Sequence, residues 1–188
     1  MRASPSVASD QDSAGLPPGS AEVIHVRRAS LADRDGVATL VMEQEGGTLE
    51  EHREGFAGEL TADRSDNLLL VAESDGHIVG FARARRFQHP PEVPENVAPK
   101  GWYLLGVMVS PAFRRRGIGA ELTRCRLAWI AERADDAWFF TEVDNHASIA
   151  LHERCGFVEV SRDFAFPRRR SSRPGILFRR SLRGGLRG

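Results

Sequence analysis

The chain has little of what marks a secreted, membrane-spanning or nucleic-acid-binding protein. Only two of its 188 residues are cysteines, so a disulfide framework is not expected and a cytoplasmic location is the simplest interpretation. No apolar run approaches the roughly 20 residues of a membrane helix, and the amino terminus lacks the apolar segment of a secretory signal. Its 26 basic and 26 acidic residues cancel, so no net field favours nucleic acid or a membrane surface.

Composition divides the chain into a central domain and two polar ends. With 41% hydrophobic residues, the chain can bury the core of one globular domain. Residues 1–20 are rich in Ser, Ala, Pro and Gly and hold almost nothing to bury, so we expect a disordered leader. Residues 181–188 end an arginine-rich stretch and predict a flexible basic tail. The expected domain therefore spans residues 21–180.

The stretch from 101 to 133 predicts a buried strand, a tight turn and an amphipathic helix, in that order. An almost unbroken apolar run covers residues 103–109, which is typical of a strand buried on both faces, and Ser110-Pro111 ends it. Apolar residues then recur with the spacing of one helix face, at Ile118, Leu122, Cys125 and Trp129. The rest of the chain is arranged around this unit.

The turn between that strand and that helix predicts an anion-binding loop. Its sequence, Arg114 to Ala120 (RRRGIGA), contains two glycines that let backbone N–H groups converge without obstruction by a Cβ atom. The start of the helix adds the positive end of its dipole. A loop of this kind holds a phosphate or pyrophosphate. It lacks the third glycine of a dinucleotide-binding fingerprint and the Lys-Ser/Thr pair of a Walker A loop.

The other elements follow from alternation, caps and turns. We expect strands at 23–28, 67–73, 77–87, 137–143, 157–166 and 176–180, and helices at 31–45, 49–62 and 145–155. A loop with four prolines, residues 88–100, is a place where a substrate could enter. The order βααβββαβαββ predicts an α/β (α+β) fold. Its centre is a mixed, mostly antiparallel twisted sheet of about seven strands, with helices on both faces.

Two motifs carry a family resemblance. Arg114-x-x-Gly117-x-Gly119 resembles the Arg/Gln-x-x-Gly-x-Gly/Ala pyrophosphate loop of GCN5-related N-acetyltransferases, the GNAT family. The segment from Asn145 to Phe157 resembles the family's Asn-x-x-Ala-x-x-Leu-Tyr-Glu-x-x-Gly-Phe motif, with Ser148 for alanine and His152 for tyrosine. Both motifs stand in order on the expected elements. The resemblance, over roughly residues 22–180, implies the GNAT fold and an acetyl-CoA-dependent N-acetyltransferase.

The resemblance also implies how acetyl-CoA is held. Its pyrophosphate is expected on the loop, and its pantetheine arm is expected to lie like an extra strand along the central strand. A bulge near Met108–Val109 would aim a backbone N–H at the thioester oxygen. The implied cofactor-binding residues are Val107, Met108, Val109, Arg114, Arg115, Arg116, Gly117, Ile118, Gly119, Ala120, Asn145, Ser148 and His152. No metal is implied.

Two residues are candidates for proton transfer. His152 stands where the family often has a tyrosine that protonates the departing thiolate, and a histidine can donate near neutral pH. The alternative is that His152 only contacts CoA or packs beside it. Glu142 is the best carboxylate for a general base, although a plain solvated strand residue is as good an interpretation. A water chain to His25, His89 or Glu92 is a further alternative.

The acceptor is the least determined part of the prediction. Eight acidic residues between Glu43 and Asp66 would favour a small cationic molecule with a primary amine, attacked directly in a ternary complex. A solvated helix surface is the alternative interpretation of these charges. Two other functions stay open: a protein acetyltransferase that modifies a lysine or an amino terminus, and a non-catalytic acyl-CoA-binding module. The sequence leaves both a monomer and a homodimer open.

Overall fold

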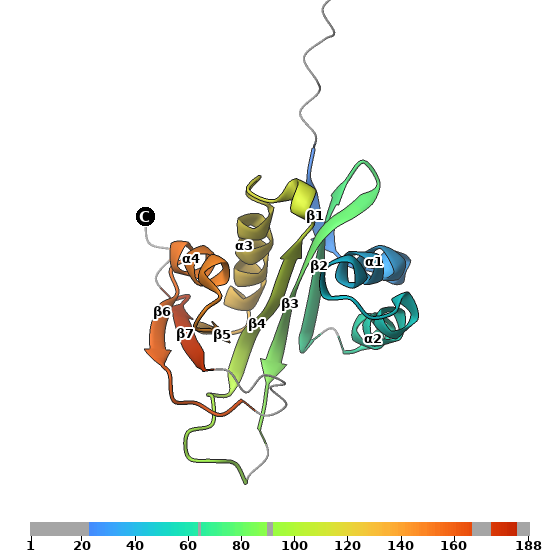
Figure 1. Ribbon diagram of the computed structural model, residues 1–188. Coiled ribbons are helices and arrows are strands. Elements are labelled where there is room, and N and C mark those ends of the chain that lie inside the picture. Colours follow the sequence, from blue (N-terminus) through green and yellow to red (C-terminus); the bar gives the residue numbers. More distant parts are fainter. Residues whose placement is uncertain (1–22, 64, 90–91, 167–173, 184–188) are drawn as a thin grey trace, which may run out of the picture.

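A computed structural model of the chain (Figure 1) describes residues 23–63, 65–89, 92–166 and 174–183. The predicted leader, and the predicted tail beyond Arg183, lie outside these residues. The described part is a single twisted sheet with helices on both faces. The fold predicted from the sequence is confirmed, because the helices and strands are of the expected kinds and follow one another in the expected order.

The sheet has seven strands in the order β1-β2-β3-β4-β5-β7-β6. Their bounds are β1 His25–Arg28, β2 Asn67–Ser74, β3 His77–Phe87, β4 Gly101–Val109, β5 Asp136–Glu142, β6 Val158–Ser161 and β7 Gly175–Ser181. Neighbouring strands are antiparallel, except that β4 and β5 are parallel. A parallel pair needs a crossover connection, and the helix that follows β4 supplies it.

The helices form two layers, one on each face of the sheet (Figure 1). One face carries α1 Arg34–Glu45, preceded by the 3₁₀ turn η1 Leu31–Asp33, and α2 Leu49–Thr61; the other carries α3 Ile118–Ala131 and α4 His146–Arg154, with η2 Pro111–Phe113 before α3. The predicted capping box begins α2, since Thr48 N–H donates to Glu51 Oε2 at 2.9 Å and Glu51 N–H donates to Thr48 Oγ1. None of the described helices is long and apolar enough to cross a membrane.

Each face of the sheet has its own apolar core. Under α3, Leu122 and Ile130 are fully buried against side chains such as Leu104 and Phe139. Each such buried aliphatic side chain contributes ~1.5–3 kcal/mol. On the other face, α1 and α2 cover strands β2 and β3, and a separate aromatic cluster surrounds Tyr103. The sheet is therefore packed between apolar side chains on both faces, except where its strands separate.

The strands β4 and β5 separate after a short ladder. Trp102 to Leu104 pairs with Ala137 to Phe139, and beyond these three residue pairs no further pairing joins the two strands. From there β4 runs on to Val109 and β5 to Glu142, each held only by its other neighbour. The resulting wedge leaves one backbone edge of β4 open. This opening is where the predicted cofactor arm would lie.

A β-bulge lies on β4 at Gly106. Ala82 pairs with Val107 and Arg83 pairs with Leu105, so Gly106 is the extra residue. Its φ is +55°, in the left-handed region that glycine adopts without strain. The bulge predicted near Met108–Val109 is therefore wrong by two residues, because Met108 and Val109 pair in register with Phe81 and Gly80.

The strand predicted at 157–166 is shorter than expected. β6 ends at Ser161, where Asp163 N–H donates to Ser161 Oγ and turns the chain. The chain then meets the proline-rich loop: Ala98 N–H donates to the Ala165 carbonyl at 2.7 Å, and Ala165 N–H donates to the Asn96 carbonyl at 2.9 Å. The alternating pattern that suggested one long strand is divided between β6 and this contact.

Candidate functional site

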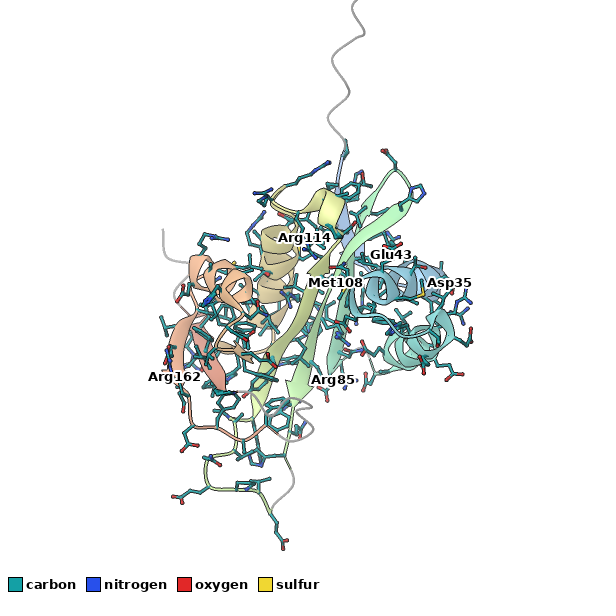
Figure 2. The ribbon with its side chains drawn as sticks, in the orientation of Figure 1. Asp35, Glu43, Arg85, Met108, Arg114 and Arg162 are labelled. Atoms are coloured by element: carbon teal, nitrogen blue, oxygen red, sulfur yellow. The ribbon has the colours of Figure 1, made fainter. Side chains whose placement is uncertain are left out.

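A cleft of about 670 Å³ occupies the wedge between β4 and β5. Its walls come from β4, β5, the loop before α3, the first turn of α3, and α4; Gln44 of α1 closes one side. Figure 2 shows Arg114 at the loop and Met108 near the middle of the sheet. Of the predicted cofactor-binding residues, those that line the cleft are Val107, Met108, Val109, Arg114, Arg115, Gly117, Ile118, Gly119, Ala120, Asn145, Ser148 and His152.

Arg116 and Glu142 do not line the cleft. The Arg116 guanidinium instead lies over the ring of Phe113, 4.8 Å from its centroid. Glu142 pairs with Gly175 in the β5–β7 ladder. Alternation along β5 puts Glu142 on the same sheet face as Phe140, opposite the face that Phe139 presents to α3. Its role as a base stays a prediction, and neither His25, His89 nor Glu92 lines the cleft.

The loop before α3 has the backbone of an anion site. Arg115 and Gly117 both have positive φ, +61° and +82°, and such a left-handed turn curls the chain into a concave nest of N–H groups. The first helical hydrogen bond runs from Glu121 N–H to the Gly117 carbonyl at 2.9 Å. The N–H groups of Ile118, Gly119 and Ala120 precede it, and no side chain caps them. They are placed to bind an anion.

Arg114 braces this loop. Its Nη2 donates to Gln44 Oε1 at 2.6 Å and its Nε donates to the Val109 carbonyl at 3.2 Å, which ties the loop to α1 and to β4. Its backbone N–H donates to the Pro111 carbonyl. The Arg114 N–H is therefore already occupied and is not available to an anion, unlike the N–H groups at the start of α3. Gln44, whose Nε2 is buried with no partner in the described part of the chain, carried no signal in the sequence.

His152 is buried and electrically neutral. Only 1% of its surface is exposed, and its ring stacks on Phe139 with centroids 3.6 Å apart and planes 9° apart. Burial lowers the pKa of His152 to about 4. Its Nδ1 lies 2.8 Å from the Ser148 carbonyl, which can only accept, so Nδ1 carries the proton. Nε2 then holds a lone pair, and it is buried with no partner among the described residues.

The other two residues of this motif position His152. Asn145 begins α4 as its N-cap, with Oδ1 accepting from Ser148 N–H at 3.2 Å. The Ser148 carbonyl in turn accepts from His152, as described above. The three residues thus form one chain of local contacts from the start of α4 to the imidazole. These contacts fix the position and the tautomer of the imidazole.

A buried arginine also lines the cleft. Arg126 of α3 is fully buried, and its guanidinium donates to backbone carbonyls of Arg83 at 3.0 Å and Gly106 at 3.4 Å. Nη2 donates to Thr123 Oγ1 at 2.9 Å and Nε to the Leu122 carbonyl. Sequence reasoning missed this residue, although Arg126 follows Leu122 by four positions on the buried helix face and precedes Ile130 by four. That spacing is the signal that could have found it.

On the opposite face of the sheet, an ion pair lies below the bulge. Arg83 Nη1 donates to Glu59 Oε1 at 2.8 Å, and the guanidinium lies over the rings of Phe56 and Phe81. A Cβ atom at Gly106 would come within 3.1 Å of Arg83 Nη2. Glycine at this position therefore serves both the bulge and the arginine packed beneath it. The described residues contain no group of three His, Cys, Asp or Glu side chains that could hold a metal ion.

Comparisons with known proteins agree with this geometry. The chain is 44% identical over 59 residues to a "Probable N-acetyltransferase HLS1-like" protein of Arabidopsis thaliana, a match that covers 30% of this chain but only 14% of the relative. It is 31% identical over 120 residues to the "Aminoglycoside N(6')-acetyltransferase type 1" of Klebsiella aerogenes, covering 61% of this chain and 76% of the relative.

Solved structures share the fold. An aminoglycoside N-acetyltransferase in complex with CoA superposes with a TM-score of 0.66 at 23% identity, covering 82% of this chain and all of that one. The model of the acetyltransferase (GNAT) family matches residues 35–157, which include the glycine loop and the motif of His152. This chain belongs to the acetyltransferase (GNAT) family, as its two motifs predict.

Proposed function

We propose that this protein transfers an acetyl group from acetyl-CoA to the primary amine of a small cationic molecule. The observation that carries the proposal is one continuous cleft, which joins the uncapped N–H groups at the start of α3 to the wedge between β4 and β5. A phosphate-binding end and an open strand edge are what a molecule with a pyrophosphate and an amide-bearing arm requires.

The residues of the cleft fit acetyl-CoA, which when bound supplies an activated acetyl thioester. The N–H groups of Ile118, Gly119 and Ala120 would bind its pyrophosphate, with Arg115 adding positive charge. The open edge of β4 would pair with the amides of its arm. Holding the thioester and the amine together is the main catalytic effect, worth up to ~7–11 kcal/mol when the geometry is good.

A negative rim supports a cationic acceptor. Glu43 and Glu45 are exposed and flank Gln44, which lines the cleft, and neither forms an ion pair within the described residues. Figure 2 shows Glu43 on the side of α1 toward Arg114 and Met108, whereas Asp35 lies on the outer side. No basic residue stands in the last turn of α1, so the negative end of its dipole adds to the two carboxylates.

Most of the other acidic side chains of this region have partners, although the exposed Glu54 forms no ion pair with a described residue. Glu59 pairs with Arg83 and Glu50 pairs with Arg53, while Glu51 caps α2. Attraction of an amine is therefore assigned to the end of α1 rather than to all eight carboxylates. Glu142 remains the proposed base, acting through water because it does not line the cleft. His152 is proposed to face the thioester as a hydrogen-bond acceptor, since its Nε2 carries no proton.

A panel of amines separates the remaining alternatives. The protein is mixed with acetyl-CoA, a thiol reagent and, in turn, aminoglycosides, polyamines, and peptides with a free lysine or amino terminus. Sustained release of CoA with a small cationic amine supports the proposal, and release with peptides alone would assign a protein acceptor instead. Calorimetric binding of CoA with no release in any mixture would leave a binding module.

Location and assembly stay predictions. A cytoplasmic protein is still the expectation from its cysteine content. A homodimer has one candidate surface: Val158 and Val160 of the edge strand β6 are 64% and 51% exposed. Exposed apolar side chains on an edge strand, one side of which is unpaired, favour association with another strand. Size-exclusion chromatography with light scattering tests the assembly directly.

A further inference from the structure

Arg126 is a buried cation with no anionic partner. Its side chain is 0% exposed, and within the described residues its hydrogen bonds go to three backbone carbonyls and one hydroxyl. No carboxylate of the described chain contacts it. A buried charge is costly unless an opposite charge compensates it, and neutral carbonyls compensate it only in part. An apolar helix position that carries such a cost indicates a negative charge brought by a ligand.

The charged groups around Arg126 do not supply that negative charge. Burial, with a smaller contribution from the neighbouring Arg83, lowers the pKa of Arg126 to about 9, so Arg126 is protonated at neutral pH. His152 is neutral, and the Arg126 charge helps to lower its pKa. Cys155 is the one neighbour that would stabilise the cation, and only as a thiolate. The part of the cleft that Arg126 lines is thus electropositive before a ligand enters.

Arg126 lies where the reacting end of the cofactor would lie. The cleft is lined by the loop before α3, by Val107 to Val109, and also by Gly106, which lies farther along β4 from the loop, together with Phe139 and His152. A chain anchored at the loop by its pyrophosphate and paired along β4 puts its far end there. That end carries the sulfur. Arg126 reaches the same place from α3 through its contact with the Gly106 carbonyl.

We propose that Arg126 stabilises the negative charge that develops on the sulfur of CoA, an inference that rests on the proposed function. In the transfer, the amine nitrogen bonds to the acetyl carbon, the carbon–sulfur bond breaks with its electron pair on sulfur, and the amine gives one proton to the water through which Glu142 is proposed to act as base. A fixed cation lets the thiolate leave before it is protonated. His152, with no proton on Nε2, is then not required as an acid.

The test is the pKa of the CoA thiol in the complex. Thiolate absorbance is titrated between pH 6 and pH 10 for CoA bound to the wild type, Arg126→Gln and Arg126→Lys. The complex with desulfo-CoA is the blank, because Cys125, Cys155 and the single tyrosine also absorb. Glutamine keeps N–H donors for the bulge carbonyls without the charge, and lysine keeps the charge without the fork of donors.

We expect the bound thiol in the wild type to titrate ~1–3 pH units below free CoA. Arg126→Gln should raise it back toward the free value, and Arg126→Lys should leave it low. The turnover number of Arg126→Gln should fall on the order of 10²-fold, with a smaller change in the KM for acetyl-CoA. A purely structural role predicts instead that both variants lose activity together and that the thiol pKa does not follow the charge.

Two results would overturn the inference while leaving the proposed function in place. One is a wild-type complex in which the thiol titrates as in free CoA, which needs no variant to fold. The other is an Arg126→Gln protein that has the melting temperature and the CoA affinity of the wild type and in which the pKa of the bound thiol is the same as in the wild type. A wild type that binds no CoA at all would overturn the proposed function as well. A lowered pKa of the bound thiol without turnover of any amine would contradict the proposed acetyl transfer, but it would support the stabilisation of the thiolate by Arg126.

Discussion

Burial of neutral His152 should make the fold sensitive to mild acid. The unfolded imidazole has a pKa of ~6.5, whereas in the folded protein the pKa is about 4. Because the folded value is the lower one, the unfolded state binds the proton more tightly. The stabilisation is fully present above pH ~6.5 and is lost as the pH falls toward 4. Replacement of His152 by phenylalanine removes this proton site and keeps a ring against Phe139.

The magnitude follows from the two pKa values. A difference of ~2.5 units corresponds to ~3 kcal/mol at the acid limit, and linkage gives ~2 kcal/mol of this loss already between pH 7 and pH 5. Asp33, whose pKa is lowered to about 2 by Arg27, contributes nothing in this window. Its own stabilisation is lost only below its unfolded value of ~3.9.

Urea unfolding at pH 7 and pH 5 measures the effect. The free energy of unfolding should fall by ~2 kcal/mol more in the wild type than in His152→Phe. The comparison cancels the other histidines and any constant cost of the substitution, including the lost bond to the Ser148 carbonyl. Equal losses in the two proteins would mean that His152 is hydrated or already charged, and would refute the tautomer assigned to it.

The remaining predictions concern the loop, the rim and the amino-terminal cap. Gly119→Val should weaken CoA binding, measured by calorimetry, at least tenfold without unfolding the protein, because its β-branched side chain crowds the N–H groups. Gly119→Ala is the milder control. Equal affinity in all three proteins would show that the loop does not bind the phosphate. The double variant Glu43→Gln, Glu45→Gln should have a KM that is raised more for a cationic amine than for acetyl-CoA, and the difference should shrink at high salt. Glu132→Gln, the control, should raise neither KM. Unchanged KM values at low salt would mean that these carboxylates are only part of a solvated surface. Asp33→Asn should cost ~2 kcal/mol by urea unfolding at pH 7, and a cost near zero would contradict the paired, capping role of this buried carboxylate.

The local elements of this fold were predictable because their signals are local. An apolar run marks β2, the Asp75-Gly76 turn joins it to β3, and the Thr48 capping box begins α2 at its expected start. The strand–loop–helix unit around Gly117 and Gly119 is likewise contained in a short stretch of sequence. Such patterns depend on residues only a few positions apart, so they can be recognised in the sequence itself.

What the sequence did not predict depends on contacts between distant segments. The bulge at Gly106 exists because Ala82 and Arg83 pair on either side of it, and these residues are more than 20 positions away. Arg126 was not singled out from the sequence, yet its guanidinium donates to the carbonyls that the same bulge exposes. His152 was expected to carry a proton toward the cofactor. Its tautomer is set by the Ser148 carbonyl, and its pKa is lowered by burial, to which Phe139 of another element contributes.

The short ladder between β4 and β5 has a mechanical consequence. The β3–β4 ladder joins eight residue pairs, whereas three pairs join β4 to β5, so the sheet consists of two plates with a narrow joint. Trp102 lies at this joint with the edge of its ring against Trp129 of α3, centroids 4.8 Å apart. Rotation of one plate about the joint changes the width of the cleft at its far end while the joint itself hardly moves. A cofactor bound in the wedge would therefore connect the two parts of the sheet, and restrict their relative rotation, where no hydrogen bonds join β4 to β5.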